Sequence, residues 1–173
     1  MKTLFFARHA KSAWDYPDLL DQDRPLLPKG IERTKLVCEF LLERGVSPDI
    51  IISSPAVRAI NTARIIAECL HYPTEAIRLE PMIYAAIGDD LLTIAFGLDN
   101  SMDSAMIVGH NPVMTFMINA FAETGIDYLP TSGIGAFSFE TDTWAGIPMA
   151  KCVTDFLIYP RLLKRKESQD ARS

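Results

Sequence analysis

The chain has little that would direct it into a membrane or out of the cytosol. Its 173 residues include only three cysteines, Cys38, Cys69 and Cys152, without a CxxC pair or a spacing typical of metal ligands. This odd number favours reduced thiols. The apolar run at the N-terminus stops at Ala7, too early for a secretory signal, and no stretch approaches the roughly 20 apolar residues of a membrane span. We therefore expect a cytoplasmic protein without a membrane partner.

An excess of positive charge is also absent from most of the chain. Residues 161–173 hold five of the 17 lysines and arginines but two of the 22 acidic residues, so residues 1–160 are acidic overall. An acidic body lacks the basic footprint of a nucleic-acid-binding protein, and we expect no nucleic acid partner. The length suits one domain. We assign residues 1–160 to that domain and residues 161–173 to a charged C-terminal tail.

The apolar pattern predicts strands that alternate with helices. Strands are expected at 2–7, 49–53, 76–79, 104–109, 135–140 and 151–158, the last two pairing like a hairpin. Helices are expected from about 28 to 45, from 54 to about 70, at 89–97 and at 113–122. Ser54 is expected to cap the second helix, with Pro55 at its first position. This alternation predicts an α/β fold, a three-layer sandwich in which helices flank a mostly parallel sheet.

Cationic side chains follow three of the predicted strands. Arg8 and His9 come directly after the first strand, and His110 comes directly after the strand at 104–109. Arg58 lies in the first turn of the helix that follows the second strand. Because ligands of parallel α/β sheets bind outside the carboxyl ends of the strands, these side chains should meet at one edge. Arginine grips phosphate oxygens two at a time, and a neutral imidazole can attack phosphorus. The pattern therefore predicts phosphoryl chemistry.

The segments around these positions resemble the histidine phosphatase superfamily. They are Arg8-His9-Ala10 with Lys11-Ser12, Arg24-Pro25-Leu26 with Gly30, Ser53-Ser54-Pro55 with Arg58-Ala59, Gly109-His110-Asn111, and Thr131-Ser132-Gly133. Within the superfamily, the opening motif and the short chain are similar to the SixA-type phosphohistidine phosphatases. The resemblance extends from residue 4 to about residue 140. It implies a phosphoglycerate-mutase-like fold and hydrolysis through a phosphohistidine intermediate.

The resemblance also implies roles for individual residues. The implied catalytic residues are His9, Arg8, Arg58 and His110. His9 would be the nucleophile, and the other three would bind the substrate phosphate. Lys11 and Ser12 are further candidates for substrate binding. Lys11 could equally be a solvated loop lysine, and Ser12 could instead hold the loop. Neither a metal nor a cofactor is expected, because the histidines are not arranged with carboxylates at ligand spacing.

One departure from the superfamily bears on the substrate. Larger members carry a catalytic glutamate after the third strand, but residues 81–88 contain no carboxylate. An alkyl phosphate gains much from a general acid, whereas phosphohistidine expels an imidazole that solvent can protonate. Phosphohistidine on a protein is therefore the preferred substrate. A small-molecule phosphomonoesterase or a mutase on phosphorylated metabolites is the first alternative, and a non-catalytic phosphate-binding module is the second.

Overall fold

The computed structural model describes residues 1–15 and 17–164, and it contains one six-stranded sheet. The strands are β1 (Lys2–Arg8), β2 (Ile50–Ser53), β3 (Arg78–Leu79), β4 (Ser104–Gly109), β5 (Ile134–Phe139) and β6 (Cys152–Ile158). Their order across the sheet is β3-β2-β4-β1-β5-β6. The first four are parallel, and β5 and β6 are antiparallel to their neighbours. The expected mostly parallel sheet with a hairpin-like last pair is confirmed.

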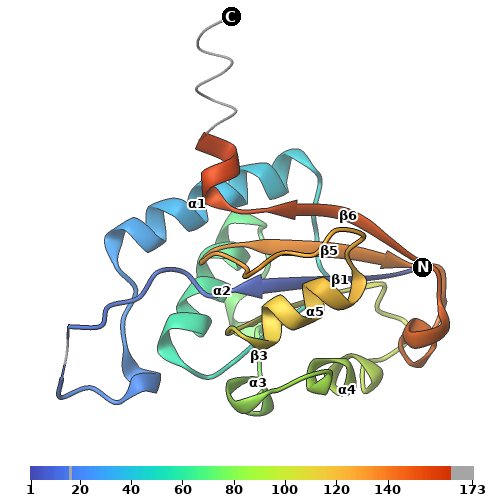
Figure 1. Ribbon diagram of the computed structural model, residues 1–173, viewed down its shortest axis with the longest axis horizontal. Coiled ribbons are helices and arrows are strands. Elements are labelled where there is room, and N and C mark those ends of the chain that lie inside the picture. Colours follow the sequence, from blue (N-terminus) through green and yellow to red (C-terminus); the bar gives the residue numbers. More distant parts are fainter. Residues whose placement is uncertain (16, 165–173) are drawn as a thin grey trace, which may run out of the picture.

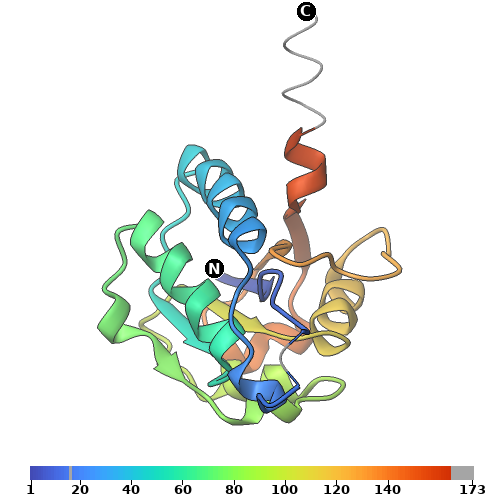
Figure 2. The same cartoon turned by 90° about the vertical axis from the view of Figure 1, so that its left-hand side faces the viewer.

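Helices cover both faces of this sheet. The α-helices are α1 (Pro28–Glu43), α2 (Val57–Cys69), α3 (Met82–Ala85), α4 (Asp90–Phe96) and α5 (Val113–Phe121). Short 3₁₀ helices occur at η1 (Asp21–Asp23), η2 (Thr74–Ala76) and η3 (Trp144–Met149). In Figures 1 and 2, α1 and α2 lie on one side of the sheet and α5 on the other. The predicted three-layer α/β sandwich is therefore confirmed.

The alternating side chains of β1 build a core on each side of the sheet. Leu4 and Phe6 point to the layer that contains Met117 of α5, whereas Phe5 and Ala7 point to the layer of α1 and α2. All four are buried. A strand buried on both faces shows a continuous apolar run, which is why β1 and β4 were predicted within one residue of their bounds.

The prediction was less accurate at three other elements. Helix α2 begins at Val57 with Ala56 as its N-cap, so Ser54 and Pro55 lie in the preceding turn. Strand β3 has two residues rather than four. Helix α3 was not predicted, because its four residues are too few for the apolar repeat of a helix to show.

The start of the predicted tail is ordered. Residues 160–164 form a helical turn, and Leu162 and Leu163 pack against the core beneath α1 and α2. Residues 165–173 of the predicted tail lie outside the described residues. Among the described helices, none has both the length and the apolar character needed to cross a membrane. The three cysteines are free thiols.

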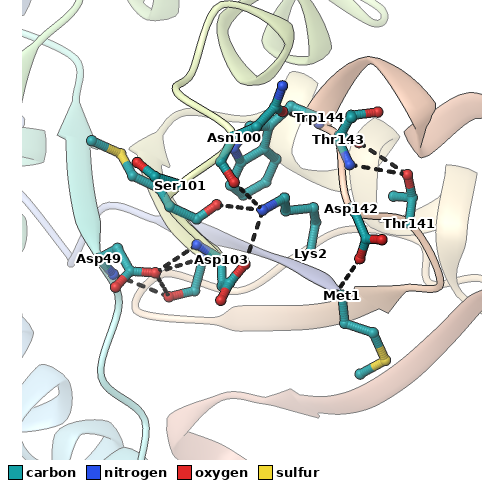
Figure 3. Close-up of polar contacts among 12 residues, drawn as sticks. Met1, Lys2, Asp49, Asn100, Ser101, Asp103, Thr141, Asp142, Thr143 and Trp144 are labelled. Carbon is teal, nitrogen blue, oxygen red and sulfur yellow. Dashed lines mark hydrogen bonds and ion pairs between the residues drawn. The ribbon is translucent and has the colours of Figure 1, made fainter.

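A buried lysine anchors the amino end of β1, far from the carboxyl edge of the sheet. Lys2 Nζ donates to Asn100 O at 2.7 Å and Asp103 Oδ1 at 2.9 Å, as Figure 3 shows, and to Met102 O at 2.8 Å. It also lies 5.6 Å from the centre of the Trp144 ring. Because all three donors of the ammonium find acceptors, Lys2 can be buried without an unpaired charge. This contact ties β1 to the loop that precedes β4.

Candidate active site

The expected convergence occurs at the edge where β1 and β4 end, which Figure 2 views face on. Arg8 pairs with Gly109 in the parallel register, and the His9 amide continues this pairing by donating to Gly109 O at 3.0 Å. His9 and His110 therefore leave adjacent strands at the same level. Their rings lie side by side, with centroids 5.1 Å apart. Register between neighbouring parallel strands thus brings together two histidines separated by 100 residues of sequence.

His9 is held in one tautomer by the backbone carbonyl of the next residue. Its Nδ1 lies 2.7 Å from Ala10 O, which can only accept, so Nδ1 carries the hydrogen and Nε2 keeps a lone pair. Burial, together with repulsion from His110, Arg58 and Arg8, lowers the pKa of His9 to about 3, although the hydrogen bond to Ala10 O acts in the opposite direction. The Ala10 amide is fixed in turn by Thr62 Oγ1 at 2.9 Å. At neutral pH, His9 is an uncharged imidazole with its nucleophilic nitrogen available.

The orientation of His110 is fixed by Ser54, a residue that was predicted to cap a helix. Its Nε2 lies 2.8 Å from Ser54 Oγ, and the same oxygen accepts from the Ala56 amide at 3.3 Å. Ser54 was predicted to cap α2; instead it orients His110. A Ser54 hydroxyl that donates to Nε2 leaves the hydrogen of His110 on Nδ1. Burial lowers the pKa of His110 to about 4, with repulsion from Arg58 acting in the same direction.

Arg58 reaches the edge from the first turn of α2 and binds an acidic residue of the loop between β1 and α1. Its Nη1 donates to Asp21 O at 2.6 Å and its Nη2 to Asp21 Oδ2 at 2.9 Å. Asp21 also pairs with Arg24 at 2.8 Å and accepts from the Tyr84 hydroxyl at 2.8 Å. Partial burial raises the pKa of Asp21, but hydrogen bonds from Tyr84 and Arg58 outweigh it and hold this pKa below its usual range.

Arg8 is held by the loop that precedes β5. Its Nη1 donates to Leu129 O at 2.7 Å, and Asn111 Nδ2 donates to the same carbonyl at 3.0 Å. Burial lowers the pKa of Arg8. The loop that carries Leu129 is tied to β1 by the Ser132 amide, which donates to His9 O at 3.3 Å. Arg8 and Arg58 both lie close enough to the two imidazoles to lower their pKa values by repulsion.

Three buried nitrogen atoms in this cluster have no hydrogen-bond partner. They are Arg8 Nε, Arg58 Nε and His110 Nδ1, and they make up most of the five such side-chain atoms in the described chain. Buried donors without acceptors are rare in folded proteins and call for a ligand or another explanation. A tetrahedral oxyanion offers only acceptors, so these donors match a phosphate group.

Comparisons with known proteins agree with this geometry. The sequence profile described as "Histidine phosphatase superfamily (branch 1)" matches residues 4–81. An uncharacterised protein of Mycobacterium tuberculosis is 30% identical over 139 residues, which cover 73% of this chain and 83% of that protein. This chain belongs to the histidine phosphatase superfamily.

Two further matches place it beside a particular group of the superfamily. The phosphohistidine phosphatase SixA of Escherichia coli is 25% identical over 167 residues, covering 87% of this chain and 99% of that protein. A solved structure of the protein histidine phosphatase SixA, complexed with tungstate, has the same fold, with a TM-score of 0.77 and 20% identity over 93% of this chain and 99% of that chain. The predicted SixA-type resemblance is confirmed, and the chain is a phosphatase with the phosphoglycerate-mutase-like fold.

The two remaining predicted site residues of this histidine phosphatase have different surroundings. Lys11 is exposed and shares the wall of an open groove with Arg8. Ser12 is buried where it forms an antiparallel bridge to Leu26. A β-carbon at Gly30 would overlap the backbone of Lys11, so glycine lets α1 begin against this loop. The Arg24-Pro25-Leu26 motif and Gly30 thus serve to hold the loop that carries Lys11 and Ser12.

Asp21 and Tyr84 were not among the predicted site residues. The signal for Asp21 was its position three residues before Arg24, a spacing that suits an ion pair. Tyr84 lies in the unpredicted helix α3, and its ring packs edge-on against His110 at 5.5 Å. Across residues 1–15 and 17–164, no three side chains of histidine, cysteine, aspartate or glutamate are arranged to hold a metal ion.

Proposed function

We propose that this phosphatase removes the phosphoryl group from phosphohistidine on a protein, with His9 as the nucleophile. The observation that carries the proposal is the set of unpartnered buried donors, Arg8 Nε, Arg58 Nε and His110 Nδ1, beside a neutral His9. The donors suit phosphoryl oxygens, and the lone pair on His9 Nε2 suits attack on phosphorus. Similarity to the phosphohistidine phosphatase SixA supports the choice of substrate.

The reaction has two steps. In the first, His9 Nε2 forms a bond to phosphorus while the bond from phosphorus to the substrate imidazole breaks, and that imidazole takes a proton from solvent. In the second, water attacks the phosphoryl group on His9 and regenerates the free imidazole. The hydrogen bond from His9 Nδ1 to Ala10 O strengthens as the ring becomes positive, which stabilises the phosphorylated ring.

The surroundings of Asp21 support a P–N substrate over an alkyl ester. Asp21 is the carboxylate that contacts the cluster, and its lowered pKa keeps it ionised at neutral pH. An ionised carboxylate cannot donate a proton to a departing alkoxide. An imidazole has a conjugate-acid pKa near 6.5, so it leaves without help from an enzyme acid. A small-molecule phosphomonoesterase or a mutase remains the alternative.

The test compares kcat/KM for a phosphohistidine protein, an aryl phosphate and an alkyl phosphate. We expect the first two to be hydrolysed and the alkyl phosphate to be slower by a factor on the order of a hundred, the typical contribution of general acid catalysis. His9→Asn should abolish turnover and the acid-labile phosphoenzyme. The matched control is His71→Asn, at an exposed histidine with φ 56° that asparagine tolerates. Equal efficiency on the alkyl phosphate would exclude the preference for P–N bonds.

Oxyanion binding gives a second test that does not depend on the substrate. Tungstate should inhibit competitively with the aryl phosphate, and a chelator should leave activity unchanged if no metal takes part. Removing one donor in such a pocket costs on the order of a hundredfold in kcat. An Arg58→Gln variant with unchanged turnover and unchanged tungstate inhibition would show that the phosphate binds elsewhere.

A further inference from the structure

An open groove of about 1340 Å³ shares Arg8 with the candidate active site. Its lining includes Arg8, Lys11 and Trp14, from β1 and the loop after it, which we call the near end. It also includes Arg33, Arg161 and Lys164, from α1 and the turn at 160–164, which we call the distal end. We call this surface the basic groove. We propose that the basic groove binds an acidic, extended segment of the protein substrate next to its phosphorylated residue. This inference rests on the proposed function.

The charge of the basic groove is opposite to that of the chain as a whole. Five cationic side chains line it, whereas Asp127 is the one acidic residue among its described lining residues. The protein carries a formal net charge of −5. Such a local reversal attracts an anionic partner and repels a basic one. One phosphoryl group cannot account for cations along the whole groove, so further negative charges of the substrate are expected there.

The basic groove also contains a buried nitrogen atom that has no hydrogen-bond partner. Arg33 projects from α1, and its buried Nε has no hydrogen-bond partner, like Arg8 Nε at the other end. Arg161 is exposed on the helical turn at 160–164. Lys164 of the same turn lies 3.7 Å from Glu32, so it contributes less free charge than the two arginines. Arg33 and Arg161 are therefore the residues on which the distal end depends.

The sheet sets the distance between the two ends. The basic groove runs from the end of β1 past the start of β5 to Tyr159, directly after β6, and Ile134 pairs with Ile158 at this edge. Two strand spacings of about 4.8 Å make a span of roughly 10 Å. An extended peptide advances about 3.3 Å per residue. Acidic residues about three positions from the phosphohistidine would therefore reach the turn after β6 that carries Arg161.

The test uses two phosphohistidine peptides that differ in their flanking residues. One carries aspartate and glutamate from about the third position outward on both sides, and the other carries serine and glycine there. We expect wild-type kcat/KM to be higher for the acidic peptide, and this advantage to fall roughly tenfold in Arg33→Glu/Arg161→Glu. It should also shrink when salt is raised from about 0.05 to 0.5 M. Lys35→Glu is the control, because Lys35 is exposed on another face of α1.

A binding measurement separates failure of this inference from failure of the proposed function. Fluorescence anisotropy of the unphosphorylated acidic peptide reports docking without chemistry. The basic groove is supported if this peptide binds to the wild type and to Lys35→Glu but not to Arg33→Glu/Arg161→Glu. This holds even if the phosphopeptides are not hydrolysed. Equal kcat/KM for the two peptides, or an acidic advantage that the double variant retains, overturns it. Competition by inorganic tripolyphosphate without any preference between the peptides also overturns it, because the groove would then take a small polyanion.

Discussion

The two active-site imidazoles should make the folded protein lose stability as the pH falls from 7 to 5. Burial lowers the pKa of His9 to about 3 and that of His110 to about 4. In the unfolded chain both would titrate near 6.5, so the unfolded state binds more protons in this range. The free energy of unfolding therefore rises with pH: the contribution is complete above 6.5 and is lost as the pH falls towards the folded-state values.

The size of the effect follows from these pKa values. At pH 5 each histidine is almost fully protonated when unfolded and almost neutral when folded, which costs about 2 kcal/mol relative to pH 7. His9 and His110 together therefore remove about 4 kcal/mol, a large part of the 5–15 kcal/mol typical of a domain. Carboxylates titrate mainly below pH 5, so the window separates the histidines from Asp21.

Urea unfolding followed by circular dichroism at several pH values measures this loss. Urea is uncharged, so ionic strength stays constant, and the buffer must lack phosphate because a bound anion stabilises the folded state. His9→Asn and His110→Asn should each lose about half of the pH dependence. The exposed control His71→Asn should keep all of it. The burial argument would be refuted if the wild type lost less than about 1 kcal/mol of unfolding free energy between pH 7 and pH 5. It would also be refuted if the double variant His9→Asn/His110→Asn kept the full loss.

Three further substitutions test the parts that support the site. Gly30→Ala should destabilise the fold by about 1–3 kcal/mol in urea unfolding, because the added methyl group would overlap the backbone of Lys11. The control is Gly97→Ala, whose methyl group would meet its neighbours at ordinary distances, and it should change stability by less than about 1 kcal/mol. Asp21→Asn should lower the phosphate inhibition constant by roughly two- to fivefold, because it releases the Arg58 fork from a competing carboxylate; a higher constant would contradict this. Lys2→Met should cost about 1–3 kcal/mol, because it leaves the carbonyls of Asn100 and Met102 without their donor. The kcat of the folded fraction should stay within about twofold; a variant as stable as the wild type would show that the ammonium is not needed.

The strands that place His9 and His110 could be predicted from local sequence. The middle residues of β1 and β4, 4–7 and 105–108, are buried and all apolar, and the polar residues that follow them mark where each strand ends. Parallel strands end at one edge, which brings Arg8, His9 and His110 together without knowledge of any side-chain contact. The superfamily and the fold class followed from these same segments.

The partners of those residues depended on the tertiary structure. Ser54 contacts His110 across 56 positions, and Asp21 contacts Arg58 across 37, through loops whose paths no local pattern determines. A serine before a proline is typical of a helix N-terminus, so the capping role was the natural but wrong prediction for Ser54.

The sequence by itself determined the α/β class and the strand and helix ends at which Arg8, His9, Arg58 and His110 lie, because these follow from apolar periodicity and from where each element begins or ends. The phosphatase family followed from the motifs around the same residues. The tertiary structure alone decided the tautomer of His9, the pairing of Arg58 with Asp21, and the basic groove. These depend on burial and on side chains of α1, the loop before β5 and the turn at 160–164 meeting at one edge. Such meetings follow from packing between distant segments, because desolvation and hydrogen-bond partners are properties of the folded chain and not of any one segment.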